Sequence, residues 1–221
     1  MKNLILALYL LFASSVSSMA QQTPGTLQLG LVAGPSHVFF DRDDVPYGNV
    51  TISSDIRWSA GLSSKYQLNK FFLKVDLLYE NKGYGAHAIL PYNGRQTQEE
   101  INQKKHFHYL TLPLLLGVDI LQSGIFLNAG PYIGRLLSQI TFESSSEAEK
   151  QTARRNETMG WEKFDYGISG GIGYYKEITP ILNVSAEIRH NRGLYDIYNW
   201  GNYNPNSTSL LLGLHYTLAT K

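Results

Sequence analysis

The chain has 221 residues, with 19 Lys or Arg against 18 Asp or Glu, so its net charge is +1 at pH 7. A nearly neutral chain has no electrostatic attraction to nucleic acid or to an anionic membrane surface, which argues against a nucleic-acid-binding protein. The lack of cysteine excludes disulfides and lipidation at a cysteine, while 15 Tyr and 20 Gly favour a β-rich fold of one domain.

The first 20 residues have the layout of a cleaved secretory signal peptide. Lys2 supplies a positive charge, residues 4–13 form an apolar stretch, and Ser18 to Ala20 form a small-residue site before Gln21. The apolar stretch is shorter than the ~20 residues that a membrane-spanning helix needs. We therefore expect an exported protein whose mature part, residues 21–221, forms one domain.

In the mature part, apolar residues alternate with small or polar ones in eight segments, as in β-strands with one oily face. In chain order these are residues 27–34, 56–63, 73–80, 109–119, 127–134, 165–174, 182–189 and 210–218. The fourth lies within HYLTLPLLLGVDI, where Pro113 must forfeit a ladder hydrogen bond, so an irregularity is expected near it. No later stretch is long and apolar enough for a transmembrane helix.

Short and long connections alternate between these strands. The short ones contain QLNK, LQSG and EITP, and the long polar ones cover roughly residues 35–55, 83–105, 142–163 and 193–207. The third long connection is highly charged and is expected to be mobile or a short helix. The pattern predicts an all-β fold, an eight-stranded antiparallel up-and-down transmembrane β-barrel with short periplasmic turns and long extracellular loops.

Alternation alone does not tell which face of the barrel is wet, because a soluble barrel turns its oily face inward. Three features favour lipid outside: the loop asymmetry, glycines on the face that carries the charges, and aromatic residues toward strand ends. The aromatic residues expected at the membrane interfaces are Trp58, Tyr66, Tyr79, Tyr109, Tyr166, Tyr174, Tyr195 and Tyr216. A soluble barrel, which would be released without detergent, is the alternative.

The inward face then carries charges of both signs. We expect an ion-pair network that fills the lumen, because a lone charge in so dry a place costs several kcal/mol; an ion pathway is the alternative. Its members are Arg57, Lys74, Asp76, Glu80, Asp119, Asp165, Glu187 and Arg189, with Lys65 beside them.

Two segments resemble a known family. HYLTLPLLLGV, residues 108–118, resembles the Tyr-Leu-x-Leu-Pro-Leu-Leu signature of PorT-like outer-membrane β-barrel proteins, and FDYGISGGIGYYKEI, residues 164–178, resembles their glycine-rich strand. The resemblance covers nearly the whole mature chain and implies the cell outer membrane as location. It also implies a link to protein secretion for some members. The last strand resembles the signal read by the barrel assembly machinery, with Gly213, Tyr216 and Leu218 at its positions.

The sequence contains no complete catalytic set. His190 has lipid-facing parity whereas Ser185 points inward, so no Ser-His-acid arrangement assembles. His106 and His108 share a strand face but have no fixed third ligand, so we interpret them as interfacial residues. The glycines of 167–173 follow strand parity and form no phosphate loop. We expect no enzymatic activity, no cofactor and no metal.

The fourth long connection, GLYDIYNWGNYNPNSTS, is the most distinctive external segment. A possible binding surface for a glycan or protein partner comprises Tyr195, Tyr198, Trp200 and Tyr203. Alternatively, the first aromatics belong to the interfacial girdle and the others pack the loop onto the rim. The sequence thus predicts a monomeric, lipid-embedded structural or interaction protein, with a small passive pore and then a lipid-modifying enzyme as alternatives.

Overall fold

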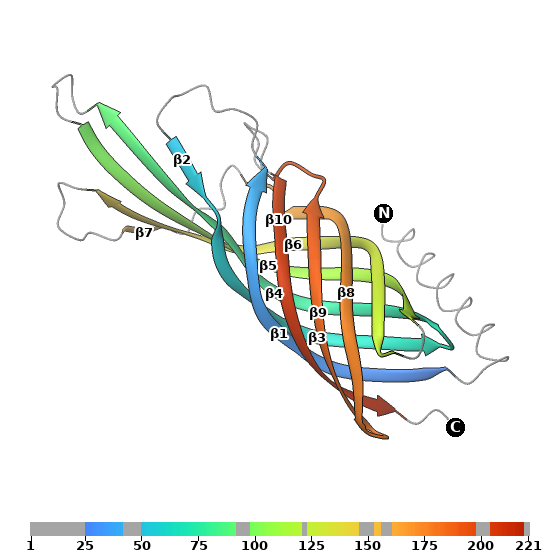
Figure 1. Cartoon of the computed structure of the whole chain (residues 1–221). Coiled ribbons are helices and arrows are strands. Elements are labelled where there is room, and N and C mark those ends of the chain that lie inside the picture. The colour runs from blue at the N-terminus through green and yellow to red at the C-terminus, as the bar shows by residue number, and fades with distance from the viewer. Residues whose placement is uncertain are drawn as a thin grey trace.

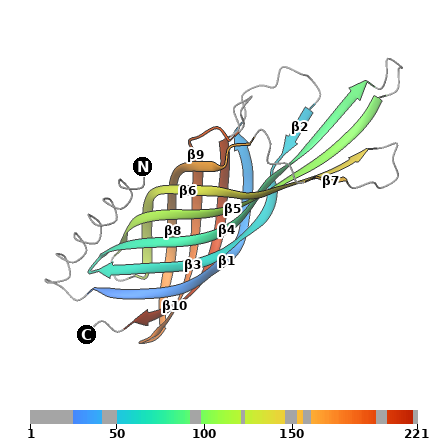
Figure 2. The same ribbon diagram turned by 180° about the vertical axis from the view of Figure 1, so that it is seen from behind.

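The computed structural model describes residues 25–41, 50–91, 98–120, 123–145, 153–155, 161–197 and 204–218. Eight long antiparallel strands pair in a closed ring, in which the last pairs with the first (Figures 1 and 2). They are β1 (Thr26–Asp41), β3 (Asp55–Leu68), β4 (Phe71–Pro91), β5 (Gln98–Ile120), β6 (Ile125–Ser145), β8 (Phe164–Thr179), β9 (Leu182–Gly193) and β10 (Asn204–Leu218). The predicted eight-stranded barrel is confirmed. Among these residues no helix is long and apolar enough to span a membrane.

The three short turns lie where the sequence predicts them. They join Leu68 to Phe71, Ile120 to Ile125 and Thr179 to Leu182. Asn69 in the first turn has φ 56° and Gly124 in the second has φ 80°. Glycine and asparagine are the residues that adopt this left-handed backbone most readily. We call this end of the barrel the turn end, and the opposite end the loop end.

At the loop end, strands extend into the predicted long connections. The expected loop 83–105 is the continuation of the β4–β5 hairpin, paired from Gly83↔His106 to Pro91↔Gln98. A short strand β2 (Val50–Ser53) pairs with β4, and β7 (Ala153–Arg155) pairs with β6. Residues 153–155 therefore form a strand, and the helix considered for the third connection is wrong there.

The irregularity expected near Pro113 is confirmed. The β4–β5 pairing stops at Val75↔Leu114 and resumes in the same register at Leu78↔Thr111, so Leu112 and Pro113 have no paired partner on β4. Proline has no N–H to donate to the neighbouring strand, which accounts for the interruption.

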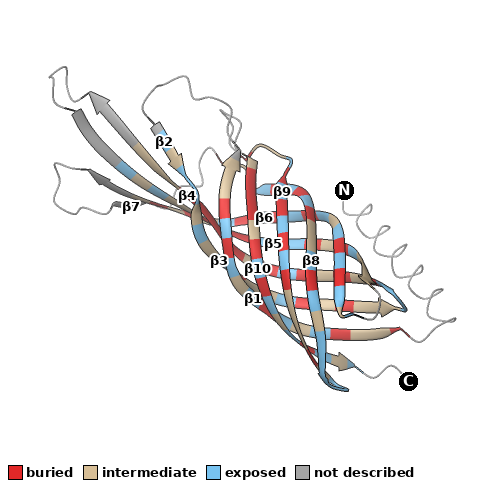
Figure 3. Ribbon diagram, viewed as in Figure 1, coloured by how far each residue is buried: buried red, intermediate tan, exposed pale blue. Residues whose placement is uncertain are grey.

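The two faces of the wall differ as the alternation predicts. Leu31 and Leu116 are 62% and 70% exposed on the outside, whereas the lumen-facing Lys74 and Asp76 are 4% and 0% exposed. Figure 3 shows the resulting alternation of buried and exposed residues along each strand. Apolar residues facing outward and charges facing inward are the pattern of a barrel in lipid, and not of a soluble carrier.

Most of the predicted girdle aromatics lie on the outer wall. Near the turn end, Tyr174 and Tyr216 are exposed and Tyr66 is half-buried. Near the loop end, Trp58 and Tyr79 lie against each other, as do Tyr166 and Tyr195.

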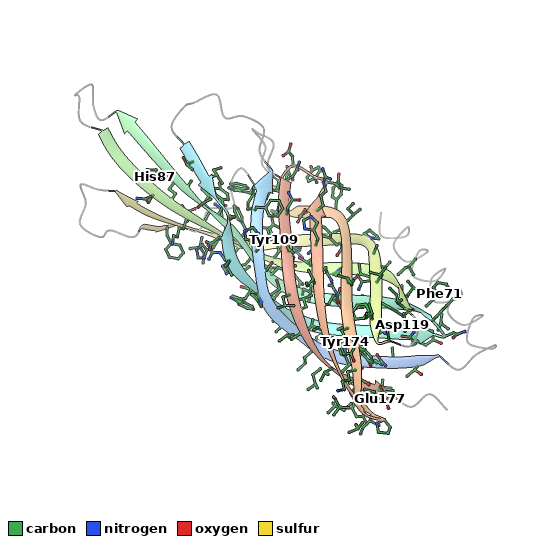
Figure 4. The ribbon with its side chains drawn as sticks, viewed as in Figure 1. Phe71, His87, Tyr109, Asp119, Tyr174 and Glu177 are labelled. Carbon is green, nitrogen blue, oxygen red and sulfur yellow. The ribbon has the colours of Figure 1, made fainter. Side chains whose placement is uncertain are left out.

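Tyr109 is the exception, and its assignment to the girdle is wrong. It is fully buried inside the barrel, because odd-numbered residues of this part of β5 point into the lumen (Figure 4).

Candidate functional site

Four charged side chains form an ion-pair layer in the turn-end half of the lumen, which we call the lower layer. Lys74 Nζ lies 2.5 Å from Glu187 Oε2, and Arg189 joins Glu187 at 2.8 Å and Asp76 at 2.7 Å. Asn128 donates a further hydrogen bond to Glu187 Oε1 at 2.9 Å. Two cations and two anions balance, and because β4 and β9 are not neighbours in the sheet, the Lys74–Glu187 pair spans the lumen.

A second group, the upper layer, lies nearer the loop end. Lys82 Nζ is 2.9 Å from Asp165 Oδ2 and 3.6 Å from Glu80 Oε2, and all three residues are almost fully buried. Thr111 donates a hydrogen bond to Glu80 at 2.7 Å, and Tyr132 donates to Asp165. Buried ions paired and hydrogen-bonded in this way avoid the cost of an isolated charge.

Lys82 is missing from the sequence-based network. The predicted strand ends at Glu80, although Lys82 continues the same alternation of inward residues on β4. Extending the alternation along β4 by two residues, from Glu80 to Lys82, predicts that Lys82 faces the lumen.

The turn end of the lumen holds a third pair. Lys65 Nζ is 3.6 Å from Asp119 Oδ1, and Gln67 donates a hydrogen bond to Asp119 at 2.5 Å. The Lys65 ammonium lies over the rings of Phe72 and Tyr175, at 4.2 and 4.7 Å from their centroids. Figure 4 shows Asp119 close to the end of the barrel, where its side chain is about one-third exposed.

Arg57 is the predicted network member that lies apart from these three groups. It is at the loop end, where its Nη2 lies 2.5 Å from Asp55 Oδ2 and its Nη1 lies 3.3 Å from His106 Nδ1. Of the eight predicted residues, the structure thus brings four together in the lower layer and two in the upper layer. Asp119 belongs to the turn-end pair.

A cluster of buried side chains closes the loop end above the upper layer. This hydrophobic cap consists of Tyr84, Phe107, Tyr109, Leu136, Trp161 and Ile197. The rings of Phe107 and Trp161 meet edge to face with centroids 4.6 Å apart. Three ion-pair groups and the cap therefore fill the lumen along the described strands.

A small cavity lies inside the barrel near the turn end. It has a volume of about 10 Å³, which is room for roughly one water molecule, and its lining includes Lys65, Lys74 and His215. Ser185 Oγ lies 2.8 Å from His215 Nε2 beside it. The sequence did not predict this contact, because it depends on the register between β9 and β10.

The Ser185–His215 pair lacks the third member of a hydrolytic triad. Nδ1 of His215 is buried without a hydrogen-bond partner among the described residues, so no carboxylate orients the ring. His190, on the outer wall, is hydrogen-bonded to Thr208. The described residues also contain no group of three or more His, Asp or Glu side chains that could hold a metal ion.

Strands β4, β5 and β6 continue beyond the barrel, where β2 and β7 pair with them; we call this extension of the sheet the external sheet (Figures 1 and 2). Pairing between β3 and β4 ends at Ser59↔Glu80, and β4 runs on to Pro91. At about 3.3 Å per residue, this part of β4 is roughly 35 Å long. His87, labelled in Figure 4, lies on this sheet and is hydrogen-bonded to Asn102 across the β4–β5 pair.

The predicted binding surface of the fourth connection is described only at its start. Tyr195 stacks on Tyr166 with ring centroids 4.8 Å apart, and Ile197 is buried in the hydrophobic cap. These contacts favour packing of this segment onto the rim. Tyr198, Trp200 and Tyr203 lie outside the described residues.

The residues of the predicted assembly signal lie at the turn-end half of β10. Tyr216 and Leu218 point outward, and Gly213 points into the lumen. A Cβ on Gly213 would collide with His215 Nε2 and Ser185 Oγ, so packing in the lumen explains a glycine at this position.

Several solved structures of outer-membrane proteins are similar to this chain. Neisserial surface protein A is 13% identical, with a TM-score of 0.38, over 86% of this chain and 97% of its own. The attachment invasion locus protein Ail of Yersinia pestis is 13% identical, with a TM-score of 0.41, over 89% and 100%. The outer membrane protein OprG of Pseudomonas aeruginosa is 12% identical, with a TM-score of 0.36, over 89% and 96%. No curated protein matches the sequence.

The sequence profile of the outer membrane protein beta-barrel domain matches residues 19–199, which is most of the chain. The profile agrees with the closed antiparallel barrel and with its outward-facing apolar band. The chain therefore belongs to the outer-membrane β-barrel family, in which short turns generally face the periplasm and long loops face the outside.

Proposed function

We propose that the protein is a non-enzymatic, non-conducting barrel of the outer membrane that acts through its external sheet and loops. The observation that carries this proposal is the contrast between a lumen filled by paired charges and a sheet that extends beyond the rim. A filled lumen leaves no path or binding site for a solute, whereas exposed strands and loops provide a surface that a partner can bind.

The filled lumen also argues against the alternative of a small pore. A conducting path needs sites that an ion can enter and leave. Here Lys74, Lys82 and Arg189 each lie against carboxylates and are nearly inaccessible, and Phe107 and Trp161 close the external mouth. An ion would have to break these contacts to pass.

The partner is a protein or a glycan at the external end, and the PorT-like resemblance favours an accessory role in protein secretion. Tyr198, Trp200 and Tyr203 remain candidates for this surface. We further propose that the barrel is a monomer in outer-membrane lipid, that it is exported by a cleaved signal peptide of residues 1–20, and that the assembly machinery reads Gly213, Tyr216 and Leu218.

The external surface can be tested in a deletion strain by comparing the proteins secreted into the medium. The wild-type gene should restore the normal profile. A variant in which residues 87–102 are replaced by Asn-Gly should not, because Ala86 and Gln103 face each other and the tight turn removes only the outer part of the hairpin. Full restoration by this variant would reject the external hairpin as the working surface. A deletion strain with normal secretion would reject the secretion role.

Conductance and lipid composition test the alternatives. Purified protein in planar bilayers should give no steady conductance, whereas conductance steps that change when Lys74 and Glu187 are substituted would favour a pore. The outer-membrane lipids of the deletion strain should be unchanged, and an altered lipid species would favour an enzyme.

A further inference from the structure

A shallow apolar groove lies on the lipid-facing wall where β10, β1, β3 and β4 adjoin. Its volume is about 740 Å³, within the usual range of ligand sites. Ala33 and Ala60 face each other across the β1–β3 pair. Their small side chains form the floor, and larger ones border it: Leu31, Trp58, Leu62, Tyr79, Leu212 and Leu214. Because this wall faces hydrocarbon, the groove has the chemistry of an acyl-chain site.

Two aromatic rings mark the external limit of the groove. Trp58 and Tyr79 lie with ring centroids 5.3 Å apart. The Tyr79 hydroxyl is 2.7 Å from His108 Nδ1, and the two rings stack. Amphipathic aromatics of this kind sit at the depth of lipid headgroups, so His108 lies at the membrane interface.

A polar cluster lies immediately beyond these rings. Residues 55–58 pair with β1 but not with β4, so the described strands β3 and β4 diverge here. Arg57 occupies the divergence, against the small Gly83, and its guanidinium contacts His106. His106 faces Gly83 on β4 and follows His108 toward the external end of the same outer face.

The hydrogen bonds fix what the imidazole of His106 offers to a ligand. A guanidinium only donates, so Nδ1 of His106 must accept from Arg57, and the neutral ring then carries its proton on Nε2. The Tyr79 hydroxyl can fix His108 in the same tautomer by donating to its Nδ1. Two N–H donors at headgroup depth suit a ligand rich in acceptor oxygens.

We propose that this groove and cluster bind one phosphorylated lipid of the outer leaflet. One acyl chain lies over Ala33 and Ala60, and the phosphate accepts hydrogen bonds from His106 and His108. This site lies on the barrel wall and does not depend on the external partner proposed above.

The electrostatics of the cluster fit this arrangement. On β5 the apolar band begins at Leu110, so His106 and His108 lie outside the membrane-spanning segment. Partial burial, and next the Arg57 guanidinium, lower the pKa of His106 to about 4 and also lower the pKa of His108. Both rings are therefore neutral at pH 7, which is the state in which Nε2 of His106 is the donor.

A second groove on the same wall provides a matched control. It also has a volume of about 740 Å³ and is lined by apolar residues that include Phe71, Leu116 and Ala129. Phe71 and Leu116 belong to the periplasmic half of the wall, close to the first turn. Among its lining residues there is no histidine or arginine. The second groove can hold an acyl chain, but its lining has no polar cluster that could bind a lipid headgroup.

Native mass spectrometry of the detergent-purified full-length protein tests the site, with lipid A and dephosphorylated lipid A as probes. Ala60→Phe fills the groove and should weaken lipid A binding about tenfold or more. The control Ala129→Phe fills the second groove and should leave binding unchanged. The double variant His106→Ala/His108→Ala should also lose about tenfold, since two charge-assisted hydrogen bonds are removed. The heat-dependent gel shift of each variant verifies that the barrel is folded.

Three results would overturn the proposal. Ala60→Phe could bind lipid A like the wild type, or Ala129→Phe could weaken binding by the same factor, and either result would exclude this groove. Dephosphorylated lipid A could bind as tightly as lipid A, which would exclude recognition of phosphate by the two histidines.

Discussion

Strands β4, β5 and β6 each pass through two regions, the barrel wall and the external sheet, and the same strands behave differently in each. In the wall, one face meets lipid and the other holds paired charges, so Leu77 is exposed and Asp76 is fully buried. Beyond the rim, the face that continues the lumen carries Tyr84 and Phe107 in the hydrophobic cap. Further out, the hydrogen-bonded pair His87 and Asn102 is exposed to solvent.

The surroundings of a strand, and not the strand itself, determine which types of residue each of its faces carries. Lipid on one side and a narrow lumen on the other leave little freedom in residue choice. A sheet that projects into water needs a strict pattern only where it covers the barrel mouth. Four substitutions or replacements test this difference, beginning with the lumen.

Removing Glu187 should have the largest effect. Glu187→Ala leaves the two cations Lys74 and Arg189 with Asp76 as their remaining carboxylate in a nearly inaccessible place, which should lower the free energy of unfolding by about 3–5 kcal/mol. Urea unfolding of the barrel in detergent or vesicles measures it. Glu177→Ala, at an exposed position near the short turn between β8 and β9, should change the same quantity by less than about 0.5 kcal/mol. Equal effects of the two variants would contradict the ion-pair account.

Truncation in the hydrophobic cap should rank second. Phe107 is fully buried and contacts Trp161 and Tyr84, so Phe107→Ala should lower the free energy of unfolding by about 3 kcal/mol. The ion-pair layers lie below the cap and are untouched, so planar bilayers should still record no conductance. If the variant conducts, the cap and not the charge layers seals the barrel.

Shortening the external hairpin should affect stability less. Replacing residues 87–102 by Asn-Gly removes strand that contributes nothing to the barrel ring. We expect the free energy of unfolding to change by less than about 1 kcal/mol, because surface segments away from the core contribute little. A loss as large as that of Glu187→Ala would mean that the external sheet and the barrel fold as one unit.

The smallest effect concerns the titration of His106. Its pKa lies near 4 in the folded protein, below the ordinary 6.5, so the unfolded chain binds more protons between these values. Its contribution to stability is present above pH 6.5 and is lost as the pH falls toward 4. Arg57→Gln removes one of the causes and should raise this pKa measurably in NMR titration. An unchanged midpoint would contradict the contact with Arg57.

The sequence predicts the barrel well because lipid and lumen specify both faces of each strand. All eight segments, the three turns and the irregularity at Pro113 follow from alternation, turn residues and the chemistry of proline. The prediction that Tyr109 belongs to the girdle rests on its position near a strand end, although the alternation along this strand already places it on the inward face. The alternation is a better guide than the distance from the strand end, because it decides whether a side chain faces lipid or the lumen.

The external sheet could not be predicted in the same way. KGYGAHAIL lacks a clear alternation, and its two glycines are typical of a loop. In the structure, Tyr84 on one side packs in the hydrophobic cap and His87 on the other is hydrogen-bonded to Asn102 at the surface. The contact between Ser185 and His215 needs the β9–β10 register, and the position of Arg57 needs the divergence of β3 from β4. Neither can be read from the residues of a single strand.

The bond from Lys74 to Glu187 joins residues 113 positions apart on strands that touch only through the closed ring. A half-built sheet would keep only the pairs made within one strand, Lys74 with Asp76 and Arg189 with Glu187, and would expose these charged groups to acyl chains, where they are costly. Partly assembled forms are penalised until the first and last strands meet. We therefore expect insertion of the strands and closure of the ring to be coupled.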